Sequence, residues 1–286
     1  MHDQAASLRR KLAFTDNSKQ AKTLCIISGK GGVGKSNIAL NFSLELINKG
    51  KKVLLIDLDV GMGNIDILLG LHAEKTIFDM FHDFESIHDI IELGPKNLGF
   101  IAGGSGVSEF FSLDEEKKEH FYHQYNEVIR MYDYIIFDMG AGVSNESLFF
   151  ILAADECIVV TTPEPTSITD AYSAIKFVIN RERAMPISVI MNRVASLKDG
   201  ERSLERFKQV VSQFLQVEVR KLGILPDDKS VSKAVIKQTP FILFDEKSKI
   251  SKAMQELTYY YLSNAKARKT IEGSFIKRLK QLLLER

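Results

Sequence analysis

Residues 29–36 read Gly29-Lys30-Gly31-Gly32-Val33-Gly34-Lys35-Ser36, and they fit the pattern G-x-x-x-x-G-K-S/T. The apolar run Leu24–Ser28 directly precedes them, and a helical pattern over Lys35–Lys49 directly follows. Glycines let backbone N–H groups curl around a polyphosphate, and the start of the helix adds a partial positive charge. The motif and its context therefore predict a phosphate-binding loop in which Lys35 bridges the β- and γ-phosphates and the Ser36 hydroxyl binds Mg²⁺.

Short apolar runs recur along the rest of the chain, separated by helical stretches. Most of them lack the apolar–polar alternation of a half-exposed strand, as is expected of strands that are buried on both faces. This repetition predicts an α/β fold, a P-loop NTPase domain with a mostly parallel, twisted sheet and helices on both of its faces. The runs are Thr23–Ser28, Lys52–Asp57, Leu98–Ile101, Asp133–Asp138, Glu156–Thr161, Pro186–Asn192 and Lys221–Leu225.

The composition is typical of a globular protein with one large domain or two small ones. Of the 286 residues, 45% are hydrophobic and 26% are charged, which excludes wholesale disorder. The net charge is only +1, so binding of a polyanion would depend on local patches. The two cysteines, Cys25 and Cys157, exclude a disulfide framework and a four-cysteine metal site. No apolar run reaches the ~18 residues of a membrane span, and residues 1–4 lack the order of a secretion signal, so we expect a cytoplasmic protein.

A second lysine, Lys30, stands inside the loop and completes the variant pattern K-G-G-x-G-K-S/T. On this motif the sequence resembles the MinD/ParA class of P-loop ATPases, which also includes iron proteins. In that class the additional lysine reaches the phosphates of the partner subunit in a nucleotide-sandwich dimer. The resemblance implies that Lys30 stabilises transition-state charge in the partner's site, much as an arginine finger does. It also implies that the loop binds ATP or ADP with Mg²⁺ through Gly31, Gly32, Val33, Gly34, Lys35, Ser36 and Asn37.

Carboxylates end two of the predicted strands, where ligands bind in open parallel sheets. The first strand ends in Asp57-Leu58-Asp59, and the second ends at Asp138. The resemblance implies that Asp57 lies near the Mg²⁺ shell, that Asp59 orients the attacking water, and that Asp138 holds Mg²⁺ through water. The predicted catalytic residues are thus Lys30, Lys35, Asp59 and Asp138, and the predicted metal site consists of Ser36, Asp57 and Asp138.

The strand over Ile187–Met191 is followed by Asn192 and Arg193, without the final acid of the guanine-reading motif N-K-x-D. This segment resembles the adenine site of the same family, where Asn192 would meet the base edge and Arg193 would pack nearby. Structural roles remain an alternative, because Asn at a strand end and Pro in a turn are common. The following loop, G-x-I/L-P-x-D/E, resembles the second base-contacting loop of the family, which implies contacts from Leu225, Pro226 and Asp228.

The segment Ser274–Arg286 predicts a short amphipathic helix with a basic side. Such a helix at a chain end suits an anionic membrane surface, and two copies in a dimer bind more strongly than one. The alternative is a final helix that docks on its own domain. The apolar stripe that would enter the membrane consists of Phe275, Ile276, Leu279, Leu282 and Leu283.

The opposite end of the chain, residues 3–9, reads D-Q-A-A-S-L-R and matches the motif D-Q-A-x-x-L-R. The motif begins members of the flagellar branch of the MinD-like family, known as FlhG, YlxH or FleN, and the resemblance covers both ends and the whole ATPase core. In that branch the arm activates FlhF, a GTPase of the signal-recognition type. The resemblance implies that Gln4 is offered to the GTPase active site, where a glutamine can position water, with Leu8 and Arg9 in the same contact. The alternative is a frayed terminal helix.

We therefore expect three parts: an activator arm and linker over 1–22, an ATPase domain over 23–261, and a basic linker with a membrane-targeting helix over 262–286. The resemblance implies an ATP-dependent homodimer that hydrolyses ATP slowly, joins the inner face of the cell membrane reversibly, and regulates flagellar number and placement. The implied partners are a second copy of the chain, an FlhF-type GTPase, flagellar C-ring proteins and the anionic membrane surface, with no specific nucleic acid.

Three other functions remain open from the sequence. A ParA-type partition ATPase would bind DNA non-specifically and with a strong salt dependence, but the apolar stripe of the tail counts against it. An iron–sulfur reductase or cluster carrier would need paired cysteines on exposed loops, whereas Cys25 and Cys157 lie in predicted strands. A scaffold with a vestigial nucleotide site is disfavoured by the intact lysines and carboxylates of the motifs.

Overall fold

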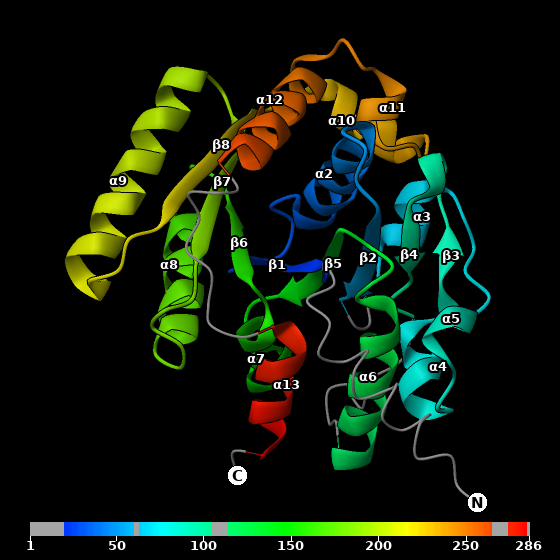
Figure 1. Cartoon of the computed structure of the whole chain (residues 1–286). Coiled ribbons are helices and arrows are strands. Elements are labelled where there is room, and N and C mark those ends of the chain that lie inside the picture. Colours follow the sequence, from blue (N-terminus) through cyan, green and yellow to red (C-terminus); the bar gives the residue numbers. More distant parts are fainter. Residues whose placement is uncertain (1–19, 60–62, 105–113, 265–273, 285–286) are drawn as a thin grey trace, which may run out of the picture.

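The computed structural model describes residues 20–59, 63–104, 114–264 and 274–284. Their centre is an eight-stranded sheet in the order β3-β4-β2-β5-β1-β6-β7-β8 (Figure 1). Neighbouring strands are parallel, except that β3 runs antiparallel to β4. The strands are β1 (Lys22–Ser28), β2 (Val53–Leu58), β3 (Glu92–Leu93), β4 (Gly99–Ile101), β5 (Tyr134–Ala141), β6 (Glu156–Thr161), β7 (Ile187–Val194) and β8 (Arg220–Pro226).

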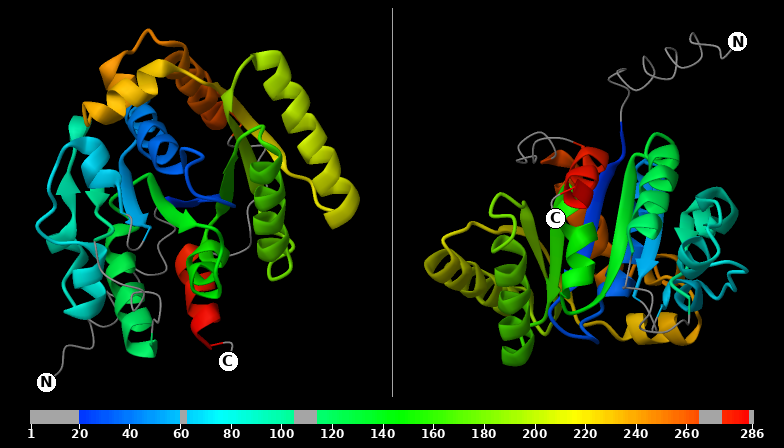
Figure 2. Two further views of the ribbon diagram at one scale, coloured as in Figure 1. Left: turned by 180° about the vertical axis from the view of Figure 1, so that it is seen from behind. Right: turned by 90° about the horizontal axis from the view of Figure 1, so that it is seen from below.

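Helices cover both faces of this sheet (Figures 1 and 2). One hydrophobic core lies under α6, α7, α8, α9 and α13, and the other lies under α2, α10, α11 and α12. The predicted α/β fold with a mostly parallel sheet is therefore confirmed. The helices are α2 (Lys35–Asn48), α3 (Ile65–Leu69), α4 (Ile77–His82), α5 (Ile87–Ile90), η1 (Pro95–Asn97), α6 (Glu115–Val128), α7 (Asn145–Ala153), α8 (Pro165–Ile179), α9 (Leu197–Leu215), α10 (Lys229–Ile236), α11 (Phe241–Phe244), α12 (Lys249–Ser263) and α13 (Phe275–Leu284).

The two cysteines are part of the sheet interior. Cys25 on β1 and Cys157 on β6 are register partners, and both are fully buried in the same core. Burial raises the pKa of both thiols, so they stay protonated and unreactive. Neither cysteine is placed to hold a cluster at an exposed loop, as the iron–sulfur alternative requires.

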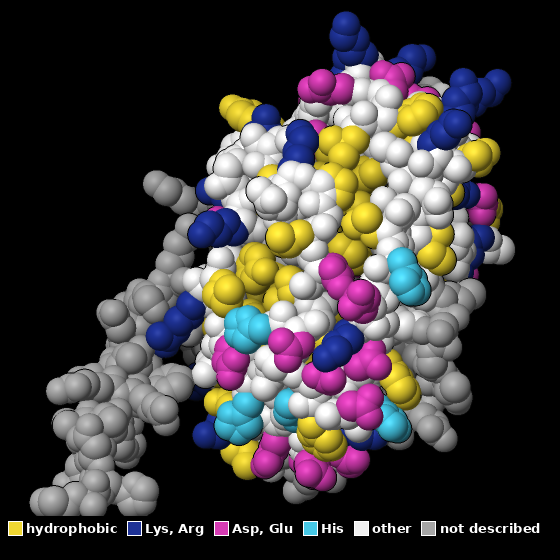
Figure 3. Space-filling model, turned by 90° about the vertical axis from the view of Figure 1, so that its right-hand side faces the viewer, with side chains coloured by type: hydrophobic (Ala, Val, Ile, Leu, Met, Phe, Trp, Pro, Cys, Tyr) yellow, Lys and Arg dark blue, Asp and Glu magenta, His cyan; other side chains and the backbone are white. Residues whose placement is uncertain are grey.

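A lateral layer of short elements lies between β2 and β4 in the chain. It consists of α3, α4, α5 and β3, and Thr76 and Asp79 form a capping box at the start of α4. Figure 3 shows this side of the molecule, where acidic and histidine side chains gather on the lower half and Lys and Arg gather near the top. The net charge of +1 is thus the sum of surface regions with opposite charge.

The last described helix, α13, packs on its own domain against α6 and α7 (Figure 1). Phe275 and Leu279 of the predicted membrane stripe are buried, and Ile276 and Leu282 are half-buried. The structure therefore has the docked arrangement that the sequence left as the alternative, and nothing is described of the Leu283 side chain. Among the described helices, none is long and apolar enough to cross a membrane.

The predicted activator motif, with Gln4, Leu8 and Arg9, lies outside the described residues, as does most of the basic linker. The described chain begins at the root of the arm, where the Ala21 N–H donates to the Ile129 carbonyl at the end of α6.

Candidate active site

The phosphate loop connects β1 to α2, and close contacts require glycine at Gly29 and Gly34. Gly34 is the N-cap of α2 with φ of +94°, a conformation that favours glycine. A methyl group on Gly34 would lie 2.6 Å from the Asn192 side-chain nitrogen, and one on Gly29 would overlap the backbone of Asp170 on α8. The loop is thus held between β7 and α8, with the start of α2 behind it.

A buried ion pair forms the centre of the site. The Lys35 Nζ lies 2.6 Å from Asp138 Oδ1 and 3.7 Å from Asp59 Oδ2, and 3.4 Å from the Ser36 hydroxyl. Lys35 is 6% exposed and Asp138 is fully buried, so each charge needs the other. The structure brings together the predicted catalytic residues Lys35, Asp59 and Asp138 with the predicted metal ligand Ser36.

This arrangement fits a magnesium ion. The second carboxylate oxygen of Asp138 is buried and has no hydrogen-bond partner among the described residues, so it can accept from a metal-bound water. Ser36 supplies a hydroxyl 3.4 Å from the Lys35 ammonium group. No cluster of three or more acidic, histidine or cysteine side chains that could hold a metal occurs among the described residues.

Asp57 has a different position from the other carboxylates. Its Oδ1 accepts from the Asp59 N–H at 2.9 Å, and its Oδ2 accepts from the N–H groups of Asn64 and Ile65 at 2.8 and 3.2 Å. Asp57 therefore fixes both ends of the segment that follows β2. It is also the register partner of Asp138 on β5, and burial together with that neighbouring charge raises the pKa of Asp57 to about 7.

Lys30 is tied within its own chain. Its Nζ lies 2.9 Å from Glu164 Oε2 and 3.0 Å from the Thr166 hydroxyl, at the start of α8. The hydrogen bond from Lys30 lowers the pKa of Glu164. Both side chains are open to solvent, where ion pairs are weak, so Lys30 can exchange this partner for a phosphate at little cost.

A cavity of about 420 Å³ opens beside the loop and fits the predicted base site. Asn192 lines it and donates from its side chain to the Val33 carbonyl at 2.8 Å, so it also positions the loop. Arg193 lines it with φ of +55°, a backbone conformation that is strained for arginine. The lining also includes Gly34, Asn37, Pro226 and Asp228 from the sequence prediction, and Ile38, Glu164, Asp227, Val231, Ser232, Phe241 and Ile250.

Leu225 was predicted beside the base but is fully buried in the core under α12. The sequence analysis missed Glu164, Phe241 and Ile250. Pro165 at the first position of α8 is a signal that could have placed Glu164 at a helix start. Phe241 and Ile250 carry no such signal, because they are ordinary apolar residues of α11 and α12.

The fold and the site together define a P-loop NTPase whose loop carries an additional lysine. A family model described as an AAA domain matches residues 21–186, and one described as NUBPL iron-transfer P-loop NTPase matches residues 119–260. The antiactivator FleN of Pseudomonas aeruginosa is 33% identical over 235 residues, which are 82% of this chain and 84% of that protein. The flagellum site-determining protein YlxH of Helicobacter pylori is 32% identical over 246 residues, covering 82% and 79%.

A solved structure agrees with these relatives. The MinC:MinD cell division complex of Aquifex aeolicus contains a chain that matches with a TM-score of 0.71 at 26% identity, over 85% of this chain and 96% of that chain. The chain therefore belongs to the MinD-like family of P-loop ATPases, and the flagellar proteins FleN and YlxH are among its relatives.

The raised pKa of Asp57 predicts proton release when Mg²⁺ and nucleotide bind. Burial raises the pKa of Asp57 to about 7 in the free protein, so part of the Asp57 carboxyl groups carry a proton at neutral pH. A cation beside Asp138 favours the ionised form and lowers the pKa, so a proton leaves on binding. Calorimetric titration with preformed Mg·ADP at pH 7 should give different enthalpies in Pipes and Tris. The difference should shrink in Asp57→Asn and at pH 9, and equal enthalpies in both buffers for the native chain would contradict the assignment.

Proposed function

We propose that this chain is an ATP-driven switch that hydrolyses ATP slowly as a face-to-face homodimer, joins the membrane when ATP is bound, and regulates flagellar number and placement. The observation that carries the proposal is the cluster of Lys35, Asp138 and Asp59 behind the phosphate loop, with Lys30 at its exposed rim. The names of FleN and YlxH support the flagellar role.

Each residue of the cluster has a separate role in phosphoryl transfer. Mg²⁺, when bound, neutralises charge on the β- and γ-phosphates, and Ser36 and Asp138 would hold it. Lys35 leaves Asp138 for the phosphate oxygens. Asp59 orients the attacking water, and burial raises its pKa, which favours acceptance of a proton.

Dimerisation supplies the remaining charge. Lys30 leaves Glu164 and reaches the triphosphate of the second subunit, where its ammonium group stabilises the transition state. Because the cis contact is weak, the triphosphate in the partner competes for Lys30 effectively. Hydrolysis then removes the γ-phosphate, which weakens the contact of Lys30 with the nucleotide of the second subunit and allows the dimer to dissociate.

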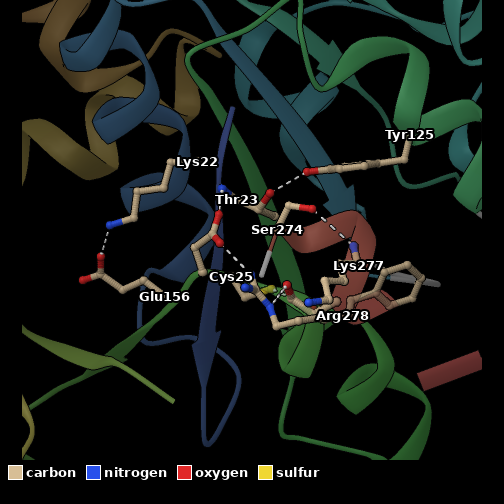
Figure 4. A network of polar contacts seen from close by, with 11 residues as sticks. Lys22, Thr23, Cys25, Tyr125, Glu156, Ser274, Lys277 and Arg278 are labelled. Carbon is tan, nitrogen blue, oxygen red and sulfur yellow. Dashed lines mark hydrogen bonds and ion pairs between the residues drawn. The ribbon is translucent and has the colours of Figure 1, made fainter. Parts of the chain in front are cut away.

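Membrane binding requires that α13 leave its docked position. The Phe275 ring packs 4.3 Å from the Tyr125 ring, measured between centroids. Arg278 lies 2.5 Å from Asp155 and donates to the Ala153 carbonyl. Figure 4 shows Arg278 within the network of polar contacts beside β1. The supporting helix α7 follows Gly140–Gly142 at the end of β5, where the γ-phosphate would be sensed. Nucleotide-dependent movement of that loop would loosen α7 and free the apolar stripe for lipid.

The activator role of the arm rests on the D-Q-A-x-x-L-R motif. Gln4 would position water in the active site of an FlhF-type GTPase, with Leu8 and Arg9 in the same contact. C-ring proteins are a further partner class. The Aquifex MinD relative, which forms a complex with MinC, supports partner binding by this fold.

Asp59→Ala should bind ATP and dimerise but should lose hydrolysis by about 100-fold, because the attacking water loses its oriented acceptor. Phosphate release is measured beside the elution volume with a non-hydrolysable ATP analogue. Asp199→Ala, an exposed acid on α9, is the matched control. Normal turnover in Asp59→Ala would remove this residue from catalysis.

Deletion of residues 274–286 should abolish co-sedimentation with anionic vesicles while nucleotide binding is kept, because the apolar stripe is then missing. Asp155→Asn should have the opposite effect and increase vesicle binding several-fold without ATP, since Arg278 loses its ionic partner. Vesicle binding that is indifferent to both changes would refute the anchor. DNA binding measured beside it tests the ParA-type alternative.

Gln4→Ala should lose stimulation of the partner GTPase and keep its own ATPase activity, because residue 4 is remote in sequence from the ATPase motifs. Gln20→Ala at the root of the arm is the matched control. Stimulation that persists in Gln4→Ala would show that this glutamine is not the activating residue.

A further inference from the structure

Two cavities lie at the edge of the sheet, at the end of β8 that is remote from the nucleotide. Their volumes are about 420 and 590 Å³, and both are lined by Glu218 and Arg220. The first is lined by Ser188, Lys208, Glu218, Val219, Arg220, Lys221, Leu222, Tyr260 and Asn264. Neither shares a lining residue with the base cavity. Arg220 and Pro226 are six residues apart on β8, so the two sites are separated by about 20 Å.

The first cavity carries an excess of positive charge. Lys208, Arg220 and Lys221 line it against a single acid, Glu218. Lys221 forms an ion pair with Glu201, and Lys208 lies 3.4 Å from Glu205. In the part of the chain that the structure describes, Arg220 has no ion pair.

Arg220 also has an unsatisfied donor. Its Nη1 is buried and has no hydrogen-bond partner among the described residues. A buried donor without an acceptor is unfavourable, and an oxyanion bound by the Arg220 guanidinium group would remove that cost. The planar guanidinium fork matches two oxygens of one phosphate group. Tyr260 and Lys208 line the same cavity and carry further donor groups.

We propose that this cavity binds a phosphate-bearing anion, with Arg220 as its principal ligand. Two sources share this chemistry: a free phosphate compound and the headgroup of an anionic lipid. The headgroup is favoured by Tyr259 and Tyr260, which are 69% and 49% exposed at the end of α12, because exposed tyrosines beside basic residues suit a membrane interface. The phosphate site itself does not depend on the proposed membrane function.

The first experiment uses inorganic phosphate and the full chain, with the nucleotide site filled by Mg²⁺ and a non-hydrolysable ATP analogue. Phosphate at constant ionic strength should raise the Tm of the native chain by about 2–4 °C at ten times its Kd. Arg220→Gln should lose this shift, with a Tm without phosphate that is no lower than that of the native chain, and Arg220→Lys should keep part of the shift. The matched control is Arg202→Gln, on the exposed side of α9, which should respond as the native chain does.

The second experiment identifies the source. Full chains are sedimented with vesicles of phosphatidylcholine, with or without about one-third phosphatidylglycerol. A loss of at least three-fold in Arg220→Gln but not in Arg202→Gln supports a lipid headgroup. Unchanged vesicle binding together with a lost phosphate shift supports a free phosphate compound. Equal phosphate shifts in native, Arg220→Gln and Arg202→Gln chains would mean an adventitious ion only and would overturn the proposal.

Discussion

The ion pair between Lys35 and Asp138 is the contact on which the arrangement of the site depends. Two opposite charges 2.6 Å apart in the buried centre of the sheet stabilise each other only while both are in place. The pair connects the first residue of α2 to the end of β5, and β5 lies between β1 and β2 in the sheet. The same short distance allows the site to respond to a bound nucleotide. A triphosphate that attracts the lysine leaves a bare carboxylate behind, and a cation is the natural replacement.

The central strands could be predicted because a strand buried on both faces appears in the sequence as an apolar run. The loop could be predicted from its glycine-rich motif. The strand Glu156–Thr161 is buried along its whole length and apolar from Cys157 to Val160, and Gly29 of the loop is required by a backbone contact. The short elements of the lateral layer gave no such pattern in the sequence. β3 has only two residues and pairs antiparallel, and α5 has four. Elements of that length have no periodicity to read, so only tertiary contacts define them.

At two places, Asp57 and the apolar stripe of α13, the spacing of residues in the sequence does not determine what their side chains contact. The pattern D-x-D places Asp57 at a strand end, but it does not tell whether a carboxylate faces a metal or its own backbone. Here both oxygens accept backbone N–H groups. The stripe of α13 is ambiguous in the same way, because the requirement for one apolar face is identical for a lipid surface and for a groove between helices. Phe275 and Leu279 satisfy it within the domain.

The docked helix also constrains how the two ends of the sheet communicate. Asp155 accepts from the Thr23 N–H at the start of β1 and pairs with Arg278 of α13, so the helix is tied to the strand that leads to the phosphate loop. Strand β1 is paired with β5 on one side and with β6 on the other, so it cannot move independently of the sheet. Helix α7 follows Gly140–Gly142 in the chain, and its apolar residues pack into the same core as α13. The proposed coupling between the nucleotide and the C-terminal helix would therefore run through α7, which packs against α13.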